Sequence, residues 1–595
     1  MQPTARRALK AGAAALVALA WAAWAPSPAR AGHDGPVFYV DAQHPAEEDA
    51  DGDRHFRSLT ALLGARPGLG RGDTVLLAPG RYEGDLVIAV EGVTLRAPDG
   101  PERTQLAGRV QLAAPGVRLE GFSIDAAGFD HGVWVRADKA ELVGLHVHGA
   151  GTGVLIEGDG PLRDVVLDGN RLYHNGTGLA GRGARHLTLT ANRIEANAGP
   201  GGALADGFKL RLAGNVWRAN GGDGLRLADA FDAQLDDEAF AANGGHGLAL
   251  AAVGGVRVAR GRFAANAGLG LDGDGVQDSA LVESALTDNG LGGLRLGGRS
   301  QNNRVAGNRI DGHARAGAAG VWLAGPVFDN AIADNALGDN RVGVLFEARG
   351  QAPGSNREQT NRMTRASAEG VRVAASGGNN VFSDNDLADN NGTGFYHAGG
   401  RDVLSGNRVS GSGGDGIWLA GGAGPALRGN ASSGNRGSGL RLGPGGDGAE
   451  VVGNRSADNH EHGVRVEGGA GHRLADNVVE GNRRHGIWLA GAAGVDVAGN
   501  RVARNGGWGL RAEGGALDAF DNAWVDNQAG GLSFEGAAAE VERNAVVRNR
   551  RLGLRAEGGA VWARRNWWGD PLGPAGAFSG GGNAVAGLAL DRVLP

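Results

Sequence analysis

The chain has 595 residues, a formal net charge of −6 and no cysteine. The small charge argues against general nucleic-acid binding, and the lack of cysteine excludes disulfides, thiol catalysis and cysteine-ligated zinc. Glycine contributes 111 residues without the Gly-X-Y period of collagen, and apolar residues make up 42%, too many for a disordered chain. A chain of this length with a single continuous core is expected only if it is a repeat array.

The first 31 residues have the pattern of a signal peptide. Arg6, Arg7 and Lys10 precede an apolar run over 11–24, and small residues at 29 and 31 provide a cleavage site. We therefore predict a mature chain that begins near Gly32 and is periplasmic or secreted. A retained membrane anchor is the alternative, although the run is short for a span and nothing later resembles a transmembrane helix.

Residues 32–73 are predicted to form an N-terminal strand and capping segment. Phe56, Leu59 and Leu63 fall on one helical face, and a short helix there would cover the open edge of the first coil. The run from Gly72 to Tyr82 contains Gly-Asp-Thr followed by Pro-Gly-Arg-Tyr, which indicates a strand entering a tight turn. This opening resembles the N-terminal segment of pectate-lyase-like β-helix proteins.

One frame recurs along the chain, Asn-x-x-x-x-Asn-x-x-x-Gly-apolar-x-apolar. The first Asn of successive frames recurs every 22 to 24 residues, at Asn385, Asn407, Asn430, Asn454, Asn477, Asn500, Asn522, Asn544 and Asn566. A looser version occurs upstream. A period near 22 with two short apolar strands is the signature of stacked β-coils, and the segments lack the i, i+3, i+4 pattern of helical repeats.

The sequence thus predicts an all-β, right-handed parallel β-helix solenoid over 74–568, with a C-terminal cap or tail over 569–595. In each strand the apolar residues point inward and the residue between them points outward, as for Trp488 between Ile487 and Leu489. We expect Gly before the strand to allow a corner conformation, and the Asn residues to adopt left-handed turns and bond from coil to coil. Trp567 and Trp568 are expected to cover the last coil rather than to bind sugar.

The outward position of the Gly-apolar-x-apolar strand alternates cations with aromatic residues. In successive coils it contains Arg226, Ala249, Asp272, Arg295, Trp322, Leu345, Arg372, Tyr396, Trp418, Arg441, Arg465, Trp488, Arg511, Ser533 and Arg555, and Trp134 and Lys209 are assigned to it in earlier coils. Aromatic faces stack on sugar rings and Arg pairs with carboxylates or sulfates. The alternative is that Trp and Arg simply shield the sheet.

A second column precedes each corner Gly. It contains His131, Asp206, Asp223, His246, Glu369, Asp415, His462 and His485, and with His397 and His460 the imidazoles gather near several arginines. Proton abstraction from a uronate C5 requires a cation to neutralise the carboxylate and a base within reach. Each His taken alone is more typical of a hydrogen-bonding turn residue.

A family resemblance enters at Asn482-Arg483-Arg484-His485-Gly486-Ile487. This segment resembles a coil of the periplasmic mannuronan C5-epimerases of alginate-producing bacteria, whose catalytic coil carries Gly-Phe-Asp-Pro-His-Asp several coils earlier. Four turns earlier in this sequence, Gly394, Phe395 and His397 match that motif, while its Asp, Pro and final Asp have no counterpart. The resemblance implies C5-epimerisation or β-elimination of an acidic polysaccharide.

Two metal hypotheses also arise. Asp272-Gly273-Asp274-Gly275, with Asp278 nearby, places carboxylates at alternate positions, which suits calcium, although a Gly-Asp turn is commoner than a metal loop. The opening and the repeats are also similar to the periplasmic β-helix proteins of copper-site maturation. A copper role requires ligands, and with no Cys and only two Met the sequence does not favour copper delivery.

The sequence therefore predicts a monomer that binds an acidic polysaccharide, and if it is an enzyme, a polysaccharide lyase or uronate C5-epimerase that requires no cofactor. The base candidates are His397, His462 and His485, with Tyr396 as an alternative base or acid. Arg441, Arg465, Arg484 and Arg511 would contact acidic groups, while Trp322, Trp418 and Trp488 would stack on sugar rings. The alternative is a non-catalytic structural or carbohydrate-binding β-helix protein.

Overall fold

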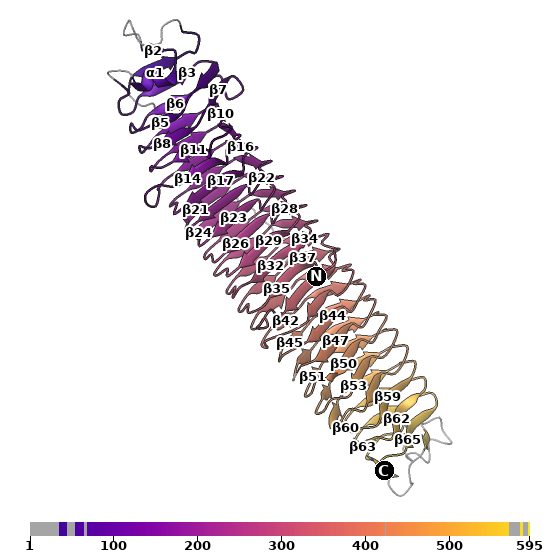
Figure 1. Cartoon of the computed structure of the whole chain (residues 1–595). Coiled ribbons are helices and arrows are strands. Elements are labelled where there is room, and N and C mark those ends of the chain that lie inside the picture. The colour runs from indigo at the N-terminus through magenta and orange to yellow at the C-terminus, as the bar shows by residue number, and fades with distance from the viewer. Residues whose placement is uncertain are drawn as a thin grey trace, which may run out of the picture.

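The computed structural model of the chain describes residues 35–44, 54–64, 68–422 and 424–569, and the backbone of two short strands at 584–586 and 593–594. These residues form one long rod in which the chain advances coil by coil from one end to the other (Figure 1). At about 4.8 Å per coil, the rod is on the order of 100 Å long. The predicted signal peptide lies outside the described residues.

Each coil contributes one strand to each of three parallel sheets. In one coil, β54 (Arg473–Ala475), β55 (Val478–Glu480) and β56 (Ile487–Ala490) follow one another along the chain. They pair in register with β57 (Val495–Ala498), β58 (Arg501–Ala503) and β59 (Trp508–Glu513) of the next coil. We name the stacks that contain β54, β55 and β56 sheets A, B and C. This arrangement confirms the predicted parallel β-helix.

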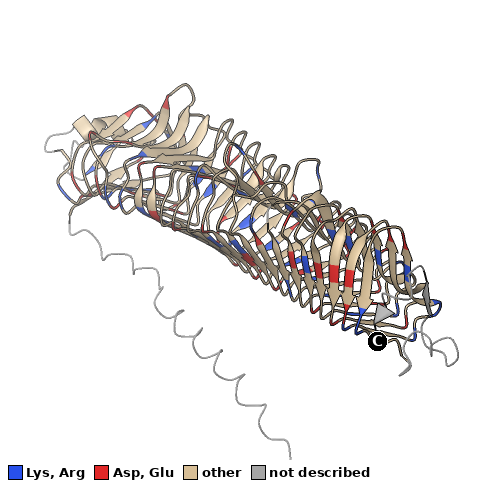
Figure 2. Ribbon diagram, turned by 90° about the horizontal axis from the view of Figure 1, so that it is seen from below, with Lys and Arg blue, Asp and Glu red and all other residues tan. Residues whose placement is uncertain are grey.

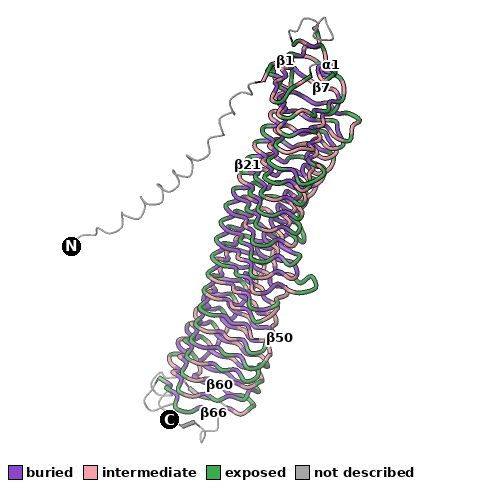
Figure 3. Tube along the Cα trace, turned by 90° about the vertical axis from the view of Figure 1, so that its left-hand side faces the viewer, coloured by how far each residue is buried: buried purple, intermediate pink, exposed green. Residues whose placement is uncertain are grey.

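The core follows from strand alternation. Ile487 and Leu489 are 0% and 2% exposed, whereas Trp488 between them is half-buried on the outer surface. Because every coil repeats this alternation, the buried side chains form one continuous column inside the rod (Figure 3). The predicted inward and outward assignments in this strand are therefore confirmed.

Two stacks of buried Asn residues join the coils. The Asn477 backbone N–H and side-chain amide both donate to Oδ1 of Asn500 at 2.9 Å, and the same amide donates to the Val451 carbonyl at 2.8 Å. Asn482 donates to Asn505 in the same way in the second stack. These side chains satisfy buried polar groups inside the rod, so the structural reading of the Asn pairs is confirmed.

Two local predictions about the turns are wrong. The left-handed residue is the one before each Asn, as at Asp476 (φ 54°), and not the Asn itself. At the corner Gly486 the requirement is space: a Cβ atom would lie 2.2 Å from Cγ1 of Val502 and 2.7 Å from the Gly509 carbonyl oxygen. Close approach of neighbouring coils, rather than an unusual φ, therefore demands glycine there.

The N-terminal end contains β1 (Val37–Val40), β2 (His55–Phe56) and the short helix α1 (Leu59–Gly64), in which Leu59 and Leu62 are buried. The helix lies where it was expected, but its capping role stays a prediction. The strands β3 (Thr74–Leu77) and β4 (Gly80–Glu83) confirm the predicted strand and tight turn.

At the C-terminal end, the two tryptophans that were predicted to cover the last coil differ in burial. After β66 (Val561–Arg564), Trp568 is 1% exposed and packs in the core, whereas Trp567 is 49% exposed. Sheet C and sheet A end with β67 (Ala584–Ala586) and β68 (Val593–Leu594). Of these two tryptophans, Trp568 therefore contributes to the end of the core.

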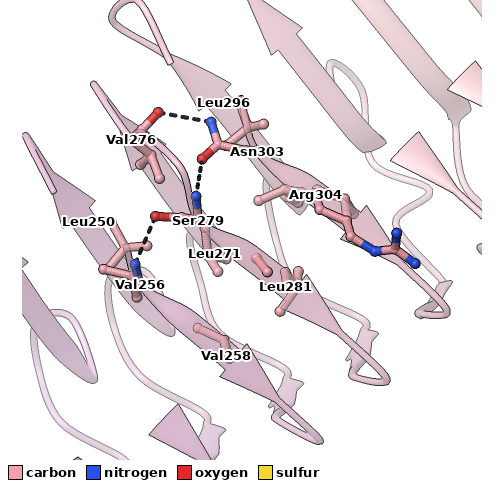
Figure 4. Close-up of a pocket in the computed structure, with 13 residues that line it drawn as sticks. Leu250, Val256, Val258, Leu271, Val276, Ser279, Leu281, Leu296, Asn303 and Arg304 are labelled. Carbon is pink, nitrogen blue, oxygen red and sulfur yellow. Dashed lines mark hydrogen bonds between the residues drawn. The ribbon is translucent and has the colours of Figure 1, made fainter. Parts of the chain in front are cut away.

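One apolar cavity in the interior is too small for a sugar. This apolar cavity of about 30 Å³ is lined by residues such as Leu250, Leu271, Leu281 and Leu294 (Figure 4). Such a volume holds about two water molecules. Because the core is packed with apolar side chains, a polymer would have to bind on the outer surface.

Candidate functional site

The outer ladder is the column of outward residues on sheet C. Its central strands are β35 (Ala319–Ala324), β38 (Val342–Glu347), β41 (Val371–Val373), β44 (Phe395–Ala398), β47 (Ile417–Gly421), β50 (Leu440–Gly445) and β53 (Val464–Glu467). Backbone register stacks these residues on successive coils: Trp322, Leu345, Arg372, Tyr396, Trp418, Arg441, Arg465, Trp488, Arg511, Ser533 and Arg555. The predicted order is confirmed from Arg226 onward.

Aromatic rings and guanidinium groups of the outer ladder stack on one another. The Arg441 guanidinium lies 4.2 Å from the centroid of the Trp418 ring, and Tyr396 meets the other side of Trp418 edge-on at 5.1 Å. Arg465 lies 4.9 Å from the Trp488 centroid. Trp322 stands three coils from Tyr396, with Arg349 at 4.5 Å from its centroid. The ladder therefore presents a row of half-buried flat groups.

Carboxylates offset the charge of the ladder arginines. Arg441 bridges Asp415 at 3.2 Å and Glu467 at 2.8 Å, and Arg465 pairs with Glu467 and, at 3.5 Å, with Glu461. Burial alone lowers the pKa of Arg441, but its hydrogen bonds to Glu467 and Asp415 raise it overall. These two arginines are therefore committed to partners within the chain.

Arg511 and Arg484 differ in how closely carboxylates of the chain pair with them. Arg511 pairs with Glu513 at 2.6 Å and with Glu535 at 3.0 Å. The Arg484 side chain is 62% exposed and approaches Glu461 only at 3.9 Å. Of the four arginines predicted to contact acidic groups, Arg484 is the one most open to a ligand.

His462, His485 and Trp488 form an aromatic stack beside the ladder. The His462 ring lies 5.2 Å from His485 and 5.0 Å from Trp488, nearly parallel to both. Burial, the neighbouring imidazole and nearby arginines lower the pKa of His462 to about 3, and burial and Arg511 lower that of His485 to about 4. Both imidazoles are therefore neutral at physiological pH, the form in which His can accept a proton.

Replacing His462 by Gln should make the protein less sensitive to acid. In the unfolded chain His462 is protonated below about pH 6.5, whereas in the folded protein it stays neutral down to about pH 3. The free energy of unfolding therefore falls as the pH is lowered from 6.5 to 3. We expect His462→Gln to recover roughly 3 kcal/mol at pH 4 in urea titrations. The exposed His460→Gln is the matched control, and an equal effect of both variants would contradict the assignment.

His397 does not join the outer ladder. It points into the coil, is 0% exposed, and its Nε2 lies 2.8 Å from the equally buried Asp402 carboxylate. A polymer on the outer face cannot reach this imidazole. The structure thus places Tyr396 in the ladder and His485 half-buried beside it, whereas His462 is only 4% exposed and His397 lies in the core.

Two residues assigned to the columns lie elsewhere. The ladder position in that coil is Ala203, whereas Lys209 belongs to β21 (Phe208–Ala213) of sheet A. Asp206 follows β20 (Gly202–Ala205) and pairs with Arg182 at 2.6 Å. The segment Gly207-Phe208-Lys209-Leu210 imitates the Gly-apolar-x-apolar pattern, but it starts the next sheet.

The sequence reasoning missed the acidic partners of the ladder. Glu513, Glu535 and Glu557 stack in register beside it, and Glu467 belongs to the same row two coils earlier. An Arg-x-Glu spacing, as at Arg511 and Glu513, puts both side chains on one face of a strand. The Arg-x-Glu spacing in the sequence could therefore have predicted these ion pairs.

The predicted calcium loop is engaged with an arginine. Asp272 pairs with Arg295 at 2.6 Å, and Asp274 lies 3.9 Å from the same guanidinium. Within the described parts of the chain, no group of three or more His, Asp or Glu residues is arranged to hold a metal ion. Calcium binding at this loop stays a prediction.

Comparison with known proteins defines the class first. The family "Right handed beta helix region" matches residues 131–268, in agreement with the solenoid. The family "Periplasmic copper-binding protein (NosD)" matches residues 265–398, 298–461 and 355–573, which together span more than half of the chain. The protein is a right-handed parallel β-helix protein, and it belongs to this second family. No curated protein matches the sequence.

Solved structures with similar folds include three polysaccharide-active enzymes. A PL6 family alginate lyase, AlyGC, is 12% identical, with 89% of this chain and 98% of that chain covered and a TM-score of 0.35. The PL6 family polysaccharide lyase Pedsa3628 from Pseudopedobacter saltans is 12% identical over 52% and 83%, with a TM-score of 0.34. A double mutant of the periplasmic alginate epimerase AlgG is 13% identical over 61% and 77%, with a TM-score of 0.26. These likenesses say nothing about activity.

The donor set of the described residues does not fit copper. Copper(I) prefers thioether, thiolate and imidazole ligands, and the one Met in the described chain, Met363, is 0% exposed in the core. His462 and His485 stack face to face instead of converging on a shared point. Separately, none of the helices in the described chain is long and apolar enough to cross a membrane.

Proposed function

We propose that the chain is an extracytoplasmic polysaccharide-binding protein whose outer ladder, between Trp322 and Arg511, holds a glycan chain. The observation that carries the proposal is the unbroken register of flat aromatic and guanidinium groups over successive coils from Arg372 to Arg511. The coil repeat of about 4.8 Å is comparable with the length of one sugar unit in an extended glycan. Trp418 and Trp488 would stack on sugar rings.

The ion pairs of the ladder favour binding over catalysis. Uronate chemistry needs a cation that is free to neutralise the substrate carboxylate beside the base. Arg441 and Arg465, however, already pair with Asp415, Glu467 and Glu461. A polysaccharide lyase or C5-epimerase would have to use Arg484, with His462, His485 or Tyr396 as base. The non-catalytic binding module is therefore our preferred form of the proposal.

An extracytoplasmic location is supported by the signal-peptide pattern and by the family's description as periplasmic. Copper binding, which the same description suggests, is not part of the proposal because the described donors do not fit that ion. A periplasmic or secreted protein meets polysaccharides of the envelope, which agrees with a glycan partner.

Replacing Trp488 by Ala should weaken glycan binding by about tenfold or more, because a stacked ring is lost without loss of core packing. Isothermal titration with the best oligosaccharide from a glycan array measures the effect. The matched control is Trp562→Ala, which removes an exposed tryptophan of sheet A in β66. Equal affinities of wild type and Trp488→Ala for every glycan would overturn the proposal.

The catalytic alternative has its own readout. A lyase would produce absorbance of unsaturated uronate from a polyuronate, and an epimerase would exchange the C5 proton with solvent. A binding module produces neither signal while still binding the glycan.

A further inference from the structure

A second face of the rod carries arginines that have no acidic partner. On sheet A, four exposed arginines occupy the same outward register position at every second coil: Arg211, Arg257, Arg304 and Arg357. We call them the arginine row. Their strands are β21 (Phe208–Ala213), β27 (Arg257–Ala259), β33 (Arg304–Ala306) and β39 (Arg357–Gln359). Within the described residues, none of the four has a carboxylate within 4 Å, in contrast to the ladder arginines.

The spacing of the arginine row is regular. The intervening strands are β24 (Phe231–Asp236), β30 (Ala280–Val282) and β36 (Ala331–Ala333), and they place Gln234, Ala280 and Ala331 between the arginines. Two coils separate neighbouring arginines by about 9.6 Å. Alanines therefore neighbour Arg257, Arg304 and Arg357 in the row, and all four arginines are exposed. Figure 4 shows the Arg304 guanidinium pointing away from the interior cavity.

A row of Phe and Gln residues, interrupted by Gly254, runs parallel to the arginine row, three residues earlier in each coil. Backbone bridges align Phe208, Phe231, Gly254, Gln277, Gln301 and Phe328 on successive coils. Phe231 is 55% exposed, and Gln277 and Gln301 are exposed as well. Phenyl faces suit the C–H faces of sugars and amides suit their hydroxyls, so this row supplies both kinds of contact.

The charge pattern of sheet A changes along the rod. Figure 2 shows Lys and Arg side by side with Asp and Glu, with acidic residues gathered on strands toward the C-terminal end. On sheet A that end carries Asp496, Asp518 and Glu540 in register, and burial, together with repulsion from Glu540 and Asp496, raises the pKa of Asp518. A polyanion is therefore repelled from that end and attracted to the arginine row.

We infer that the arginine row binds an extended acidic polysaccharide along sheet A. In a ribbon-like glycan, successive sugars face opposite ways, so acidic groups on one side recur at every second sugar, which matches an arginine at every second coil. The inference rests on the proposed function only in taking a polysaccharide as the partner. It names the acidic class and assigns it to a different face from the outer ladder.

The test uses the full chain with polygalacturonate and its fully methyl-esterified form, which share a backbone and differ in charge. We expect Arg257→Ala/Arg304→Ala to weaken polygalacturonate binding about tenfold, while the wild type binds the ester weakly and loses affinity for the acid form as salt rises. The matched control is Arg262→Ala/Arg309→Ala, which removes two exposed arginines from sheet B in the same coils.

Equal losses in both double variants would show a general charge effect and overturn the inference, as would single-stranded DNA that binds as tightly as polygalacturonate. The ladder variant Trp488→Ala separates the two proposals. If Trp488→Ala loses glycan binding while Arg257→Ala/Arg304→Ala keeps it, the proposed function stands and the arginine row fails. If the reverse is found, the arginine row stands and the ladder fails.

Discussion

Cutting Ile487 back to alanine should lower the free energy of unfolding by about 2–5 kcal/mol, whereas Arg465→Ala on the same stack should cost about 1 kcal/mol or less. Ile487 is 0% exposed in the column of buried side chains, so its truncation leaves a cavity. Arg465 is outward and its contacts are a ring face and two carboxylates. Urea titrations of both variants measure the difference.

The contrast between the two variants tests the orientation of the sheet C strands. Leu440→Ala and Val464→Ala are further inward truncations from the preceding coils, and both should behave like Ile487→Ala. If Arg465→Ala were as destabilising as Ile487→Ala, the arginine would be a structural residue, and its use as a binding group would lose its basis.

Replacing Glu358 by Gln should stabilise the protein at neutral and alkaline pH. Glu358 lies in the core of sheet A, 0% exposed, where it accepts one hydrogen bond from Asn361 while its other carboxylate oxygen has no partner. Burial raises its pKa to about 8. The fold therefore holds the protonated form, and the stability that this form provides is complete below about pH 4.5 and is lost as the pH rises to 8.

We expect Glu358→Gln to remove this pH dependence and to raise the free energy of unfolding by on the order of 4 kcal/mol at pH 8. Near pH 4 the two proteins should be equally stable. Glu83→Gln, whose side chain is 81% exposed, is the control and should change little at either pH. A Glu358→Gln variant that is no more stable than the wild type at pH 8 would contradict a buried, protonated Glu358.

The repeat made most of the fold predictable. The Asn-x-x-x-x-Asn spacing located the turns, and the apolar-x-apolar strands gave the inward and outward sides of sheet C, including the stacking order from Trp322 to Arg511. Both features are local, since a coil packs on its sequence neighbours. For the same reason the pattern failed where one coil departs from the frame, at Lys209 and Asp206.

The energetics of the site were harder to predict than its position. Whether an outward arginine is free depends on residues one coil away, such as Glu467 beside Arg441, and on side-chain directions that a periodic pattern does not define. His397 has the alternation of an inward residue, yet its polarity suggested a surface role. The buried Asp402 that accompanies it explains how the core accommodates an imidazole.

The most direct test of glycan binding by the outer ladder is oxidative footprinting of tryptophan side chains in the unaltered protein, with and without a bound oligosaccharide. The account predicts that Trp418 and Trp488 are protected by the ligand, while Trp562 and Trp567, exposed at the C-terminal end, are oxidised equally in both samples. Saturating glycan that leaves Trp418 and Trp488 as reactive as before would contradict the account.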